Sequence, residues 1–241
     1  MKALIIGGNQ GIGAAIAQQL MAKEDFTVIR TSRQYRQLNQ DSDRSWKVQC
    51  DVSDVQSIET MTNQIQQQFE DLDWLINCAG VLHTEQYRPE KALKQVNQAQ
   101  MSDQFTTNAA GHLLVLQSLQ PLLTTGNPAL VCSVSARIGS IEDNHLGGWY
   151  AYRMSKAALN MGMKTAAIEW ARHSPQVKFL LLHPGTTDTA LSAPFQQRLP
   201  KGQLQSESTT ARLLIKQLNE HQNHASKYPL YLDHHGQPIP W

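Results

Sequence analysis

The chain has 241 residues and nearly balanced charges, with 21 Lys and Arg against 20 Asp and Glu. This length suits one or two domains and can bury a core that needs no metal or disulfide to support it. A formal net charge of +1 gives neither the basic face that binds nucleic acid nor the polybasic patch that binds a membrane surface.

The cysteines and the apolar segments indicate the cellular compartment of the protein. Cys50, Cys78 and Cys132 are odd in number and lie in or beside short apolar runs, so we expect buried thiols and no disulfide framework. No run approaches the ~20 apolar residues that span a bilayer. Residues 1–6 are too short for a signal peptide and lead directly into glycines. These features predict a cytoplasmic protein with no membrane partner.

Short apolar segments typical of strands alternate along the chain with longer segments of helical period. Strands are predicted at residues 2–6, 26–29, 46–52, 74–77, 129–134, 177–182 and 230–232. Helices are predicted at 12–20, 55–69, 105–116 (ending near Pro121), 153–171 and 208–220. This alternation predicts a single α/β domain over residues 1–241, a doubly wound parallel sheet of about seven strands with helices on both faces.

Four stretches lack regular periodicity: residues 34–45, 83–100, 139–149 and 187–206. We expect the first to be a surface excursion. The other three follow the carboxyl ends of strands, where doubly wound sheets bind ligands.

Glycines cluster between the first strand and the first helix, where residues 7–13 read Gly-Gly-Asn-Gln-Gly-Ile-Gly. In such a turn, backbone N–H groups can approach a pyrophosphate at the helix N-terminus. A tight turn that binds nothing could use the same glycines, but the strand-to-helix position favours a nucleotide. The residues expected to bind it here are Gly7, Asn9, Gln10, Gly11, Ile12 and Gly13.

The segment after the second strand discriminates between dinucleotides. An acidic residue there would bind the ribose hydroxyls of NAD and repel the 2′-phosphate of NADP. No Asp or Glu occurs between residues 28 and 39, and Ser32 and Arg33 stand at this position. The sequence therefore predicts NADP(H), with NAD(H) as the alternative, unless the arginines here are only solvated surface residues.

Tyr152 and Lys156 are four residues apart in a predicted helix and therefore share a face. A neighbouring ammonium lowers the pKa of a phenol, which could then donate a proton to a substrate oxygen near neutral pH. Ser135 ends the preceding strand and could hold the same oxygen, and Ser133 is the competing candidate. A surface Tyr–Lys pair with no function has the same spacing, so the context has to decide.

Taken together, these motifs resemble the short-chain dehydrogenase/reductase family over nearly the whole chain. The family's glycine motif matches at Gly7, Gly11 and Gly13, with Ile6 in place of the usual Thr. The resemblance implies a Rossmann-type sheet. It also adds residues to the expected cofactor site, which are Asp51, Val52, Asn77, Ala79, Gly80, Pro184, Gly185, Thr187 and Thr189.

The family's mechanism implies a role for each remaining residue. Tyr152 would protonate a carbonyl oxygen, and Lys156 would lower the pKa of that phenol and bind the nicotinamide ribose. Ser135 would orient the carbonyl, although it stands 17 residues before the tyrosine where the family usually has about 13. Asn108 would hold a water, and residues 187–206 would cover the substrate. Five apolar residues could line the substrate pocket or belong to the core, namely Leu82, Trp149, Leu191, Phe195 and Leu199.

The segment Ser135–Ile141 and the ending Gly-Gln-Pro-Ile-Pro-Trp are similar to the C-factor-like branch of the family. The expected function is an NADPH-dependent reductase of a small ketone or aldehyde. An NAD-dependent alcohol dehydrogenase and a nucleotide-binding signalling protein with little turnover are the alternatives. The resemblance also implies a homodimer or homotetramer formed through helices near 102–119 and 153–171. The histidines near the C-terminus are read as surface residues, and no metal site is expected.

Overall fold

The computed structural model describes residues 1–226 and 228–241. Its strands form one sheet in the order β3-β4-β2-β1-β5-β6-β7-β8. Their bounds are β1 (Lys2–Ile6), β2 (Thr27–Ser32), β3 (Asn39–Ser42), β4 (Ser45–Gln49), β5 (Trp74–Asn77), β6 (Ala129–Val134), β7 (Val177–His183) and β8 (Leu230–Asp233). Every neighbouring pair is parallel except β3 and β4.

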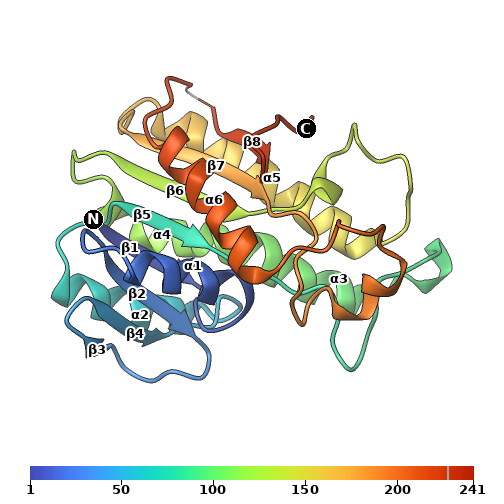
Figure 1. Cartoon of the computed structure of the whole chain (residues 1–241), viewed down its shortest axis with the longest axis horizontal. Coiled ribbons are helices and arrows are strands. Elements are labelled where there is room, and N and C mark those ends of the chain that lie inside the picture. The colour runs from blue at the N-terminus through green and yellow to red at the C-terminus, as the bar shows by residue number, and fades with distance from the viewer. Residues whose placement is uncertain (227) are drawn as a thin grey trace.

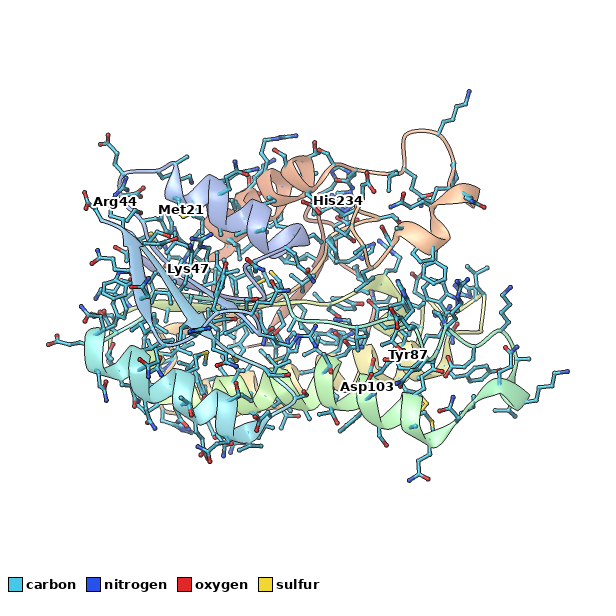
Figure 2. All side chains as sticks on the ribbon, turned by 90° about the horizontal axis from the view of Figure 1, so that it is seen from below. Met21, Arg44, Lys47, Tyr87, Asp103 and His234 are labelled. Atoms are coloured by element: carbon cyan, nitrogen blue, oxygen red, sulfur yellow. The ribbon has the colours of Figure 1, made fainter. Side chains whose placement is uncertain are left out.

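Helices cover both faces of this sheet (Figure 1). They are α1 (Gly11–Met21), α2 (Val55–Gln68), α3 (Gln98–Phe105), α4 (Gly111–Leu123), α5 (Tyr150–Trp170) and α6 (Glu207–His221). Short 3₁₀ turns are η1 (Leu93–Gln95), η3 (Arg137–Gly139) and η4 (Ala193–Arg198), and the π-helical turn η2 (Thr106–Ala110) joins α3 to α4. Seen from below, α1 and α6 lie on one side of the sheet, and α2 and α4 lie on the other (Figure 2).

The sheet has an apolar core on each face, which explains why the sequences of its strands are continuous hydrophobic runs. Successive side chains of a strand point to opposite faces, so Leu4 and Ile6 join the core beneath α2, α4 and α5. Ala3 and Ile5 join the core beneath α1 and α6. Both faces are therefore buried, as the doubly wound prediction requires. The fold class predicted from the sequence is confirmed.

One local prediction was wrong. The stretch expected to be a surface excursion contains β3, so the sheet has eight strands. Strand β3 reads Asn-Gln-Asp-Ser and is wholly exposed, so it carries no hydrophobic signal. It pairs with β4, and Asp41 accepts salt bridges from Arg30 at 2.6 Å and Lys47 at 2.7 Å. Helix α4 ends at Leu123, close to Pro121 as predicted, and its last two residues, Leu122 and Leu123, are buried.

The chain reverses its strand order beside β1, which has β2 on one side and β5 on the other. Ligands of doubly wound sheets bind at the carboxyl ends of the strands next to such a reversal. The loops that include η1, η3 and η4 extend beyond the body of the sheet (Figure 1). In the part of the chain that the structure describes, no helix is both long enough and apolar enough to cross a membrane.

All three cysteines are free thiols, as expected. Cys50 and Cys132 are buried and Cys78 is half-buried. Burial raises the pKa of Cys50 and of Cys78 to about 12, so neither is a thiolate at neutral pH.

Candidate active site

The glycine turn between β1 and α1 is packed so closely that side chains would not fit. Gly7 and Gly11 have φ angles of 74° and 58°, which L side chains rarely adopt. A Cβ atom at Gly13 would lie 2.3 Å from the carbonyl oxygen of Gly7. The first turn of α1 carries no acidic side chain of its own, and a carboxylate oxygen of Glu207 lies 4.0 Å from the Cβ position of Gly11. This cradle fits the pyrophosphate of a dinucleotide.

The other predicted residues of this turn hold it in place. The Tyr35 hydroxyl donates to Asn9 Oδ1 at 2.6 Å, which ties the turn to the segment after β2. Gln10 is the N-cap residue of α1. Its backbone is extended, and its side chain forms no capping hydrogen bond with the helix. Ile12 packs partly against the core under α1 and α6.

The segment after β2 presents a cation and no carboxylate of its own. Ser32 ends β2, and its Oγ accepts from the Gln34 N–H at 3.1 Å. Arg33 is exposed and has no ion-pair partner within residues 1–226 and 228–241. Arg30, in contrast, is held by Asp41. Arg33 and the equally exposed Arg36 are therefore the guanidinium groups of this segment that are available to a phosphate, and Arg33 is the one at the predicted position.

Asp51 and Val52 follow β4, at the same carboxyl end of the sheet as the glycine turn. Asp51 Oδ1 accepts from the N–H and the hydroxyl of Ser53, at 2.9 and 2.6 Å. Val52 is buried, and a Cβ atom at Gly111 would lie 2.4 Å from its carbonyl oxygen. These contacts fix the backbone of Asp51 and Val52 in the predicted cofactor site.

The loop after β5 is clamped by Asn108. This fully buried residue lies in η2, a π-helical turn of the kind often found at functional sites. Its amide accepts from the Val81 N–H at 2.7 Å and donates to the Val81 carbonyl at 2.8 Å and to Ser155 Oγ at 3.0 Å. Asn77 Oδ1 accepts from the Ala79 N–H at 3.1 Å. The side-chain amide of Asn108 is thus engaged by Val81 and Ser155.

Lys156 is a buried ammonium next to this loop. Its Nζ donates to the Val134 carbonyl at 2.9 Å, and it lies 3.8 Å from where a Cβ atom of Gly80 would be. Burial lowers the pKa of Lys156 to about 8. The buried His112 nearby bonds to the carbonyl of Ala79 at 3.0 Å, and burial lowers its pKa to about 3.

Tyr152 lies one helical turn before Lys156 and is 8% exposed. Lys156 Nζ stands 5.9 Å from the centre of its ring. The expected lowering of the phenol's pKa is not what this structure shows. Burial, with a smaller effect of Tyr231, raises the pKa of Tyr152 above its ordinary value. The phenol therefore keeps its proton at neutral pH.

Neither candidate serine presents a free hydroxyl. Ser135 is buried and its Oγ donates to Asn160 Oδ1 at 2.6 Å. Ser133 is also buried, and its Oγ lies 3.1 Å from Nδ1 of His112. Ser135 can orient a substrate carbonyl only by giving up its bond to Asn160.

The segment after β7 reaches the glycine turn. Gly185 has a φ of 73°, and a Cβ atom there would lie 2.5 Å from Gln205 Nε2. Thr187 is buried and shares a hydrogen bond of 2.8 Å with Thr210. The methyl group of Thr189 lies 3.5 Å from the Cβ position of Gly11. The predicted covering segment thus begins beside the predicted pyrophosphate site, where Pro184 precedes Gly185.

Aromatic rings stand beside the Tyr152 phenol. The ring centre of Trp149 is 6.3 Å from that of Tyr152 and 5.0 Å from that of Phe195. His83 lies 5.7 Å from Phe195. Sequence reasoning included Trp149 and Phe195 among the pocket candidates but missed His83, which nothing in its local pattern marks. Of the remaining pocket candidates, Leu82 is buried and Leu191 and Leu199 are half-buried.

Within the described residues, no three His, Cys, Asp or Glu side chains gather closely enough to hold a metal ion. The predicted surface histidines near the C-terminus differ in exposure. His235 is exposed, whereas His221, His224 and His234 are half-buried. His234 lies near α6 (Figure 2).

Comparisons with known proteins agree with this geometry. Residues 1–200 match the family described as short chain dehydrogenase. The chain is 36% identical over 171 residues to the C-signal protein of Myxococcus xanthus, covering 70% of this chain and 93% of that one. It is 28% identical over 192 residues to 1-hydroxy-2-glutathionyl-2-methyl-3-butene dehydrogenase of a Rhodococcus species, covering 80% of each.

The fold of this chain is also similar to those of solved structures. The NADPH-bound carbonyl reductase from chicken fatty liver superposes with a TM-score of 0.83 at 24% identity, over 100% of this chain and 94% of the other. At this identity the likeness shows the fold alone. The family match, the relatives and the arrangement of glycine turn, tyrosine and lysine agree: the chain belongs to the short-chain dehydrogenase family and is an NAD(P)-dependent oxidoreductase.

Proposed function

We propose that the protein is an NADPH-dependent reductase of a small ketone or aldehyde, with the reaction centre at Tyr152 and Lys156. The observation that carries this proposal is the burial of both side chains on one face of α5, beside the loop that Asn108 clamps. When bound, the dinucleotide supplies the hydride. The chain's own residues supply the proton, the binding site and the exclusion of water.

Tyr152 donates the proton in this proposal. Its raised pKa keeps the phenol protonated at neutral pH, so the hydroxyl can donate to the carbonyl oxygen as the carbonyl carbon accepts the hydride. The product is the alcohol, and the tyrosine regains its proton from solvent. Lys156 carries most of its positive charge at pH 7, because its pKa is about 8. Its ammonium favours the phenolate that forms after proton transfer.

The remaining predicted residues have binding or supporting roles. Arg33 would hold the 2′-phosphate, because it is exposed and unpaired within the described chain. Asn108 would fix the loop at Gly80 beside Lys156, since its amide is engaged with Val81 and Ser155. The Ser135 hydroxyl donates to Asn160, so we give it no place on the substrate carbonyl.

Two relatives support alternative functions. The Rhodococcus relative is named a dehydrogenase, which supports alcohol oxidation with NAD as the second candidate. The relative named C-signal supports a signalling protein that binds the nucleotide and turns over little. The reductase is favoured over this third candidate because burial shifts the pKa of both Tyr152 and Lys156, and groups with shifted pKa values cluster at active sites.

One experiment tests the proposal directly. The purified chain would be mixed with NADPH and, in turn, with a panel of aliphatic and aromatic ketones and aldehydes, and the loss of NADPH absorbance followed. The same panel of alcohols would be tested with NAD and NADP. We expect turnover in the reductive direction with NADPH that Tyr152→Phe abolishes. Turnover only with NAD and alcohols would favour the second candidate, and tight NADPH binding without turnover the third.

A further inference from the structure

A strained turn leads into helix α5. Gly147, Gly148 and Trp149 have successive left-handed φ angles of 64°, 67° and 54°. Glycine adopts this conformation at little cost, but a bulky aromatic residue rarely does. Across residues 1–226 and 228–241, Trp149 is the one residue other than glycine with a positive φ. Such outliers persist only where the surrounding structure enforces them, and they cluster at functional sites.

Two residues, Glu90 and Arg153, hold this conformation in place. Glu90 is 2% exposed. Its carbonyl accepts from the Trp149 N–H at 2.6 Å, and its carboxylate accepts from the Ala151 N–H at 3.3 Å. From the other side, Arg153 donates to the carbonyls of Gly148 at 2.9 Å and Gly147 at 3.1 Å. Glu90 and Arg153 both form hydrogen bonds with the backbone of this turn. These bonds fix the direction in which the Trp149 side chain points.

The neighbouring loop is itself anchored, which makes Glu90 a firm support. Gln100 and Gln104 are buried on α3 and donate to the carbonyls of Arg88 and Leu82. The Tyr87 hydroxyl donates to Asp103, and Figure 2 shows the two residues close together beside α3.

The fixed side chain is the indole that faces Tyr152. Its ring meets the Tyr152 ring nearly edge-on, at 6.3 Å and 65°, and it contacts Phe195 at 5.0 Å. His83 stands edge-on to Phe195, and its Nε2 bonds to the carbonyl of Ala190 at 3.3 Å. Three rings from three separate segments therefore form a continuous series of contacts, which reaches the Tyr152 ring through Trp149. We call His83, Trp149 and Phe195 the aromatic wall.

We propose that the aromatic wall selects a planar aromatic ketone or aldehyde, with Trp149 as the specificity-determining residue. The aryl ring of the substrate would lie against Trp149 and Phe195, with its carbonyl oxygen at the Tyr152 hydroxyl. Aromatic pairs in edge-on or offset geometry gain affinity beyond that of buried area alone. A saturated ring of the same size fills the same volume without that gain. This inference rests on the proposed reductase function.

The test compares two ketones of similar size, acetophenone and cyclohexyl methyl ketone, with NADPH as reductant. The kcat/KM ratio of the two ketones is measured for each variant and divided by the wild-type ratio, so their intrinsic reactivities cancel. For Trp149→Leu we expect the ratio to shift about three- to tenfold against acetophenone, with cyclohexyl methyl ketone little affected. Trp149→Phe keeps a ring and should retain most of the preference.

The chain contains a matched control pair. Trp46 and Phe69 pack edge-on at 5.5 Å on the β4 side of the molecule. Phe195→Leu should shift the ketone ratio in the same direction as Trp149→Leu, whereas Phe69→Leu should leave it unchanged. Thermal unfolding and NADPH affinity report whether each variant is folded. An equal loss for both ketones in Trp149→Leu and Phe195→Leu would overturn the inference, because it would show a packing role only.

A binding measurement separates this inference from the reductase proposal. Calorimetry would compare 1-phenylethanol and 1-cyclohexylethanol binding to the NADPH-loaded protein, a mixture with no hydride acceptor. We expect 1-phenylethanol to bind more tightly, and Trp149→Leu to remove the difference. If that holds while no ketone is reduced, the aromatic wall stands and the reductase proposal fails. If ketones are reduced but neither the binding nor the ratio depends on Trp149, the reductase stands and this inference fails.

Discussion

The hydroxyl of Ser135 donates a hydrogen bond of 2.6 Å to Asn160 Oδ1, and both side chains are buried between β6 and α5. The amide of Asn160 in turn donates to the Gly139 carbonyl at 3.3 Å. Ser135 therefore links the end of β6 to the helix that carries Tyr152. The bond uses the hydroxyl hydrogen that a carbonyl-orienting serine would need.

We predict that Ser135→Ala reduces stability more clearly than turnover. The change leaves a buried amide oxygen with one partner fewer, which costs about 1–3 kcal/mol of unfolding free energy. Turnover should fall less than tenfold, a small loss beside the ~10²–10⁴-fold typical of a lost general acid. Urea unfolding and steady-state kinetics would be compared with those of Ser133→Ala. A loss of kcat as large as that of Tyr152→Phe, at unchanged stability, would place Ser135 on the substrate.

The buried ammonium of Lys156 predicts a pH dependence of stability. Its pKa is about 8 in the folded chain, against an ordinary value of 10.5. Between these values the unfolded chain holds more protons than the folded one, so stability rises as the pH rises through this range. Lys156→Met should remove the dependence and raise stability at pH 7 by about 1–3 kcal/mol, while turnover is lost. Denaturant unfolding at pH 7 and pH 9.5 measures both effects. A wild-type chain that is less stable at the higher pH would contradict the assignment, once Lys156→Met has been used to subtract other groups.

The exposed Arg33 predicts a preference for NADPH over NADH. A hydrogen bond to a charged group contributes about 1.5–3 kcal/mol, and 1.4 kcal/mol is about tenfold in affinity. The dissociation constants, measured by cofactor fluorescence, should therefore differ by tenfold or more. Ser32→Asp should reverse the order, because its carboxylate repels the 2′-phosphate and accepts from the ribose hydroxyls. Equal affinity of the unmodified chain for both cofactors would refute the role of Arg33.

An apolar stripe on α5 predicts a dimer. Met154, Met161 and Ile168 are exposed and stand seven residues apart, so they follow one line along the helix. Phe105 at the end of α3 is exposed as well, and α3 packs against α5. Met161→Glu should convert a dimer or tetramer into monomer in sedimentation velocity at micromolar concentration. Val55→Glu, on the separate helix α2, should not. Wild-type protein that sediments only as monomer would contradict this prediction.

The parts of the fold that could be read from the sequence are those with a local signal. Strands β5 and β6 lie at their predicted bounds, because each is a buried apolar run with turn residues after it. Strand β3 was missed, because its polar residues are held by pairing and by the Asp41 salt bridges. The pKa of Tyr152 was expected to fall, because spacing reveals a neighbouring charge but not the depth of burial.

The sequence allowed the members of the candidate site to be proposed, but not the orientations of their side chains. The glycine turn, Tyr152 and Lys156 are local motifs and the structure brings them to one end of the sheet. The direction of the Ser135 hydroxyl depends on Asn160, which is 25 residues further on. The left-handed backbone of Trp149 depends on Glu90, which is 59 positions earlier in the sequence numbering. Such long-range contacts leave no trace in local periodicity.

Tyr152→Phe is the variant on which the proposed mechanism depends most. It keeps the ring, its edge-on contact with Trp149 and its burial, and it removes only the hydroxyl. Without that hydroxyl the forming alkoxide has no proton donor beside it. We expect kcat to fall by about 10²–10⁴-fold. The dissociation constant of NADPH should change less than about threefold, because the charge-assisted contacts assigned to Arg33 and Lys156 remain. Single-turnover kinetics and fluorescence titration on the same preparation separate the two quantities. Near-normal kcat in Tyr152→Phe would remove the tyrosine from the acid role and require a different proton donor in the site.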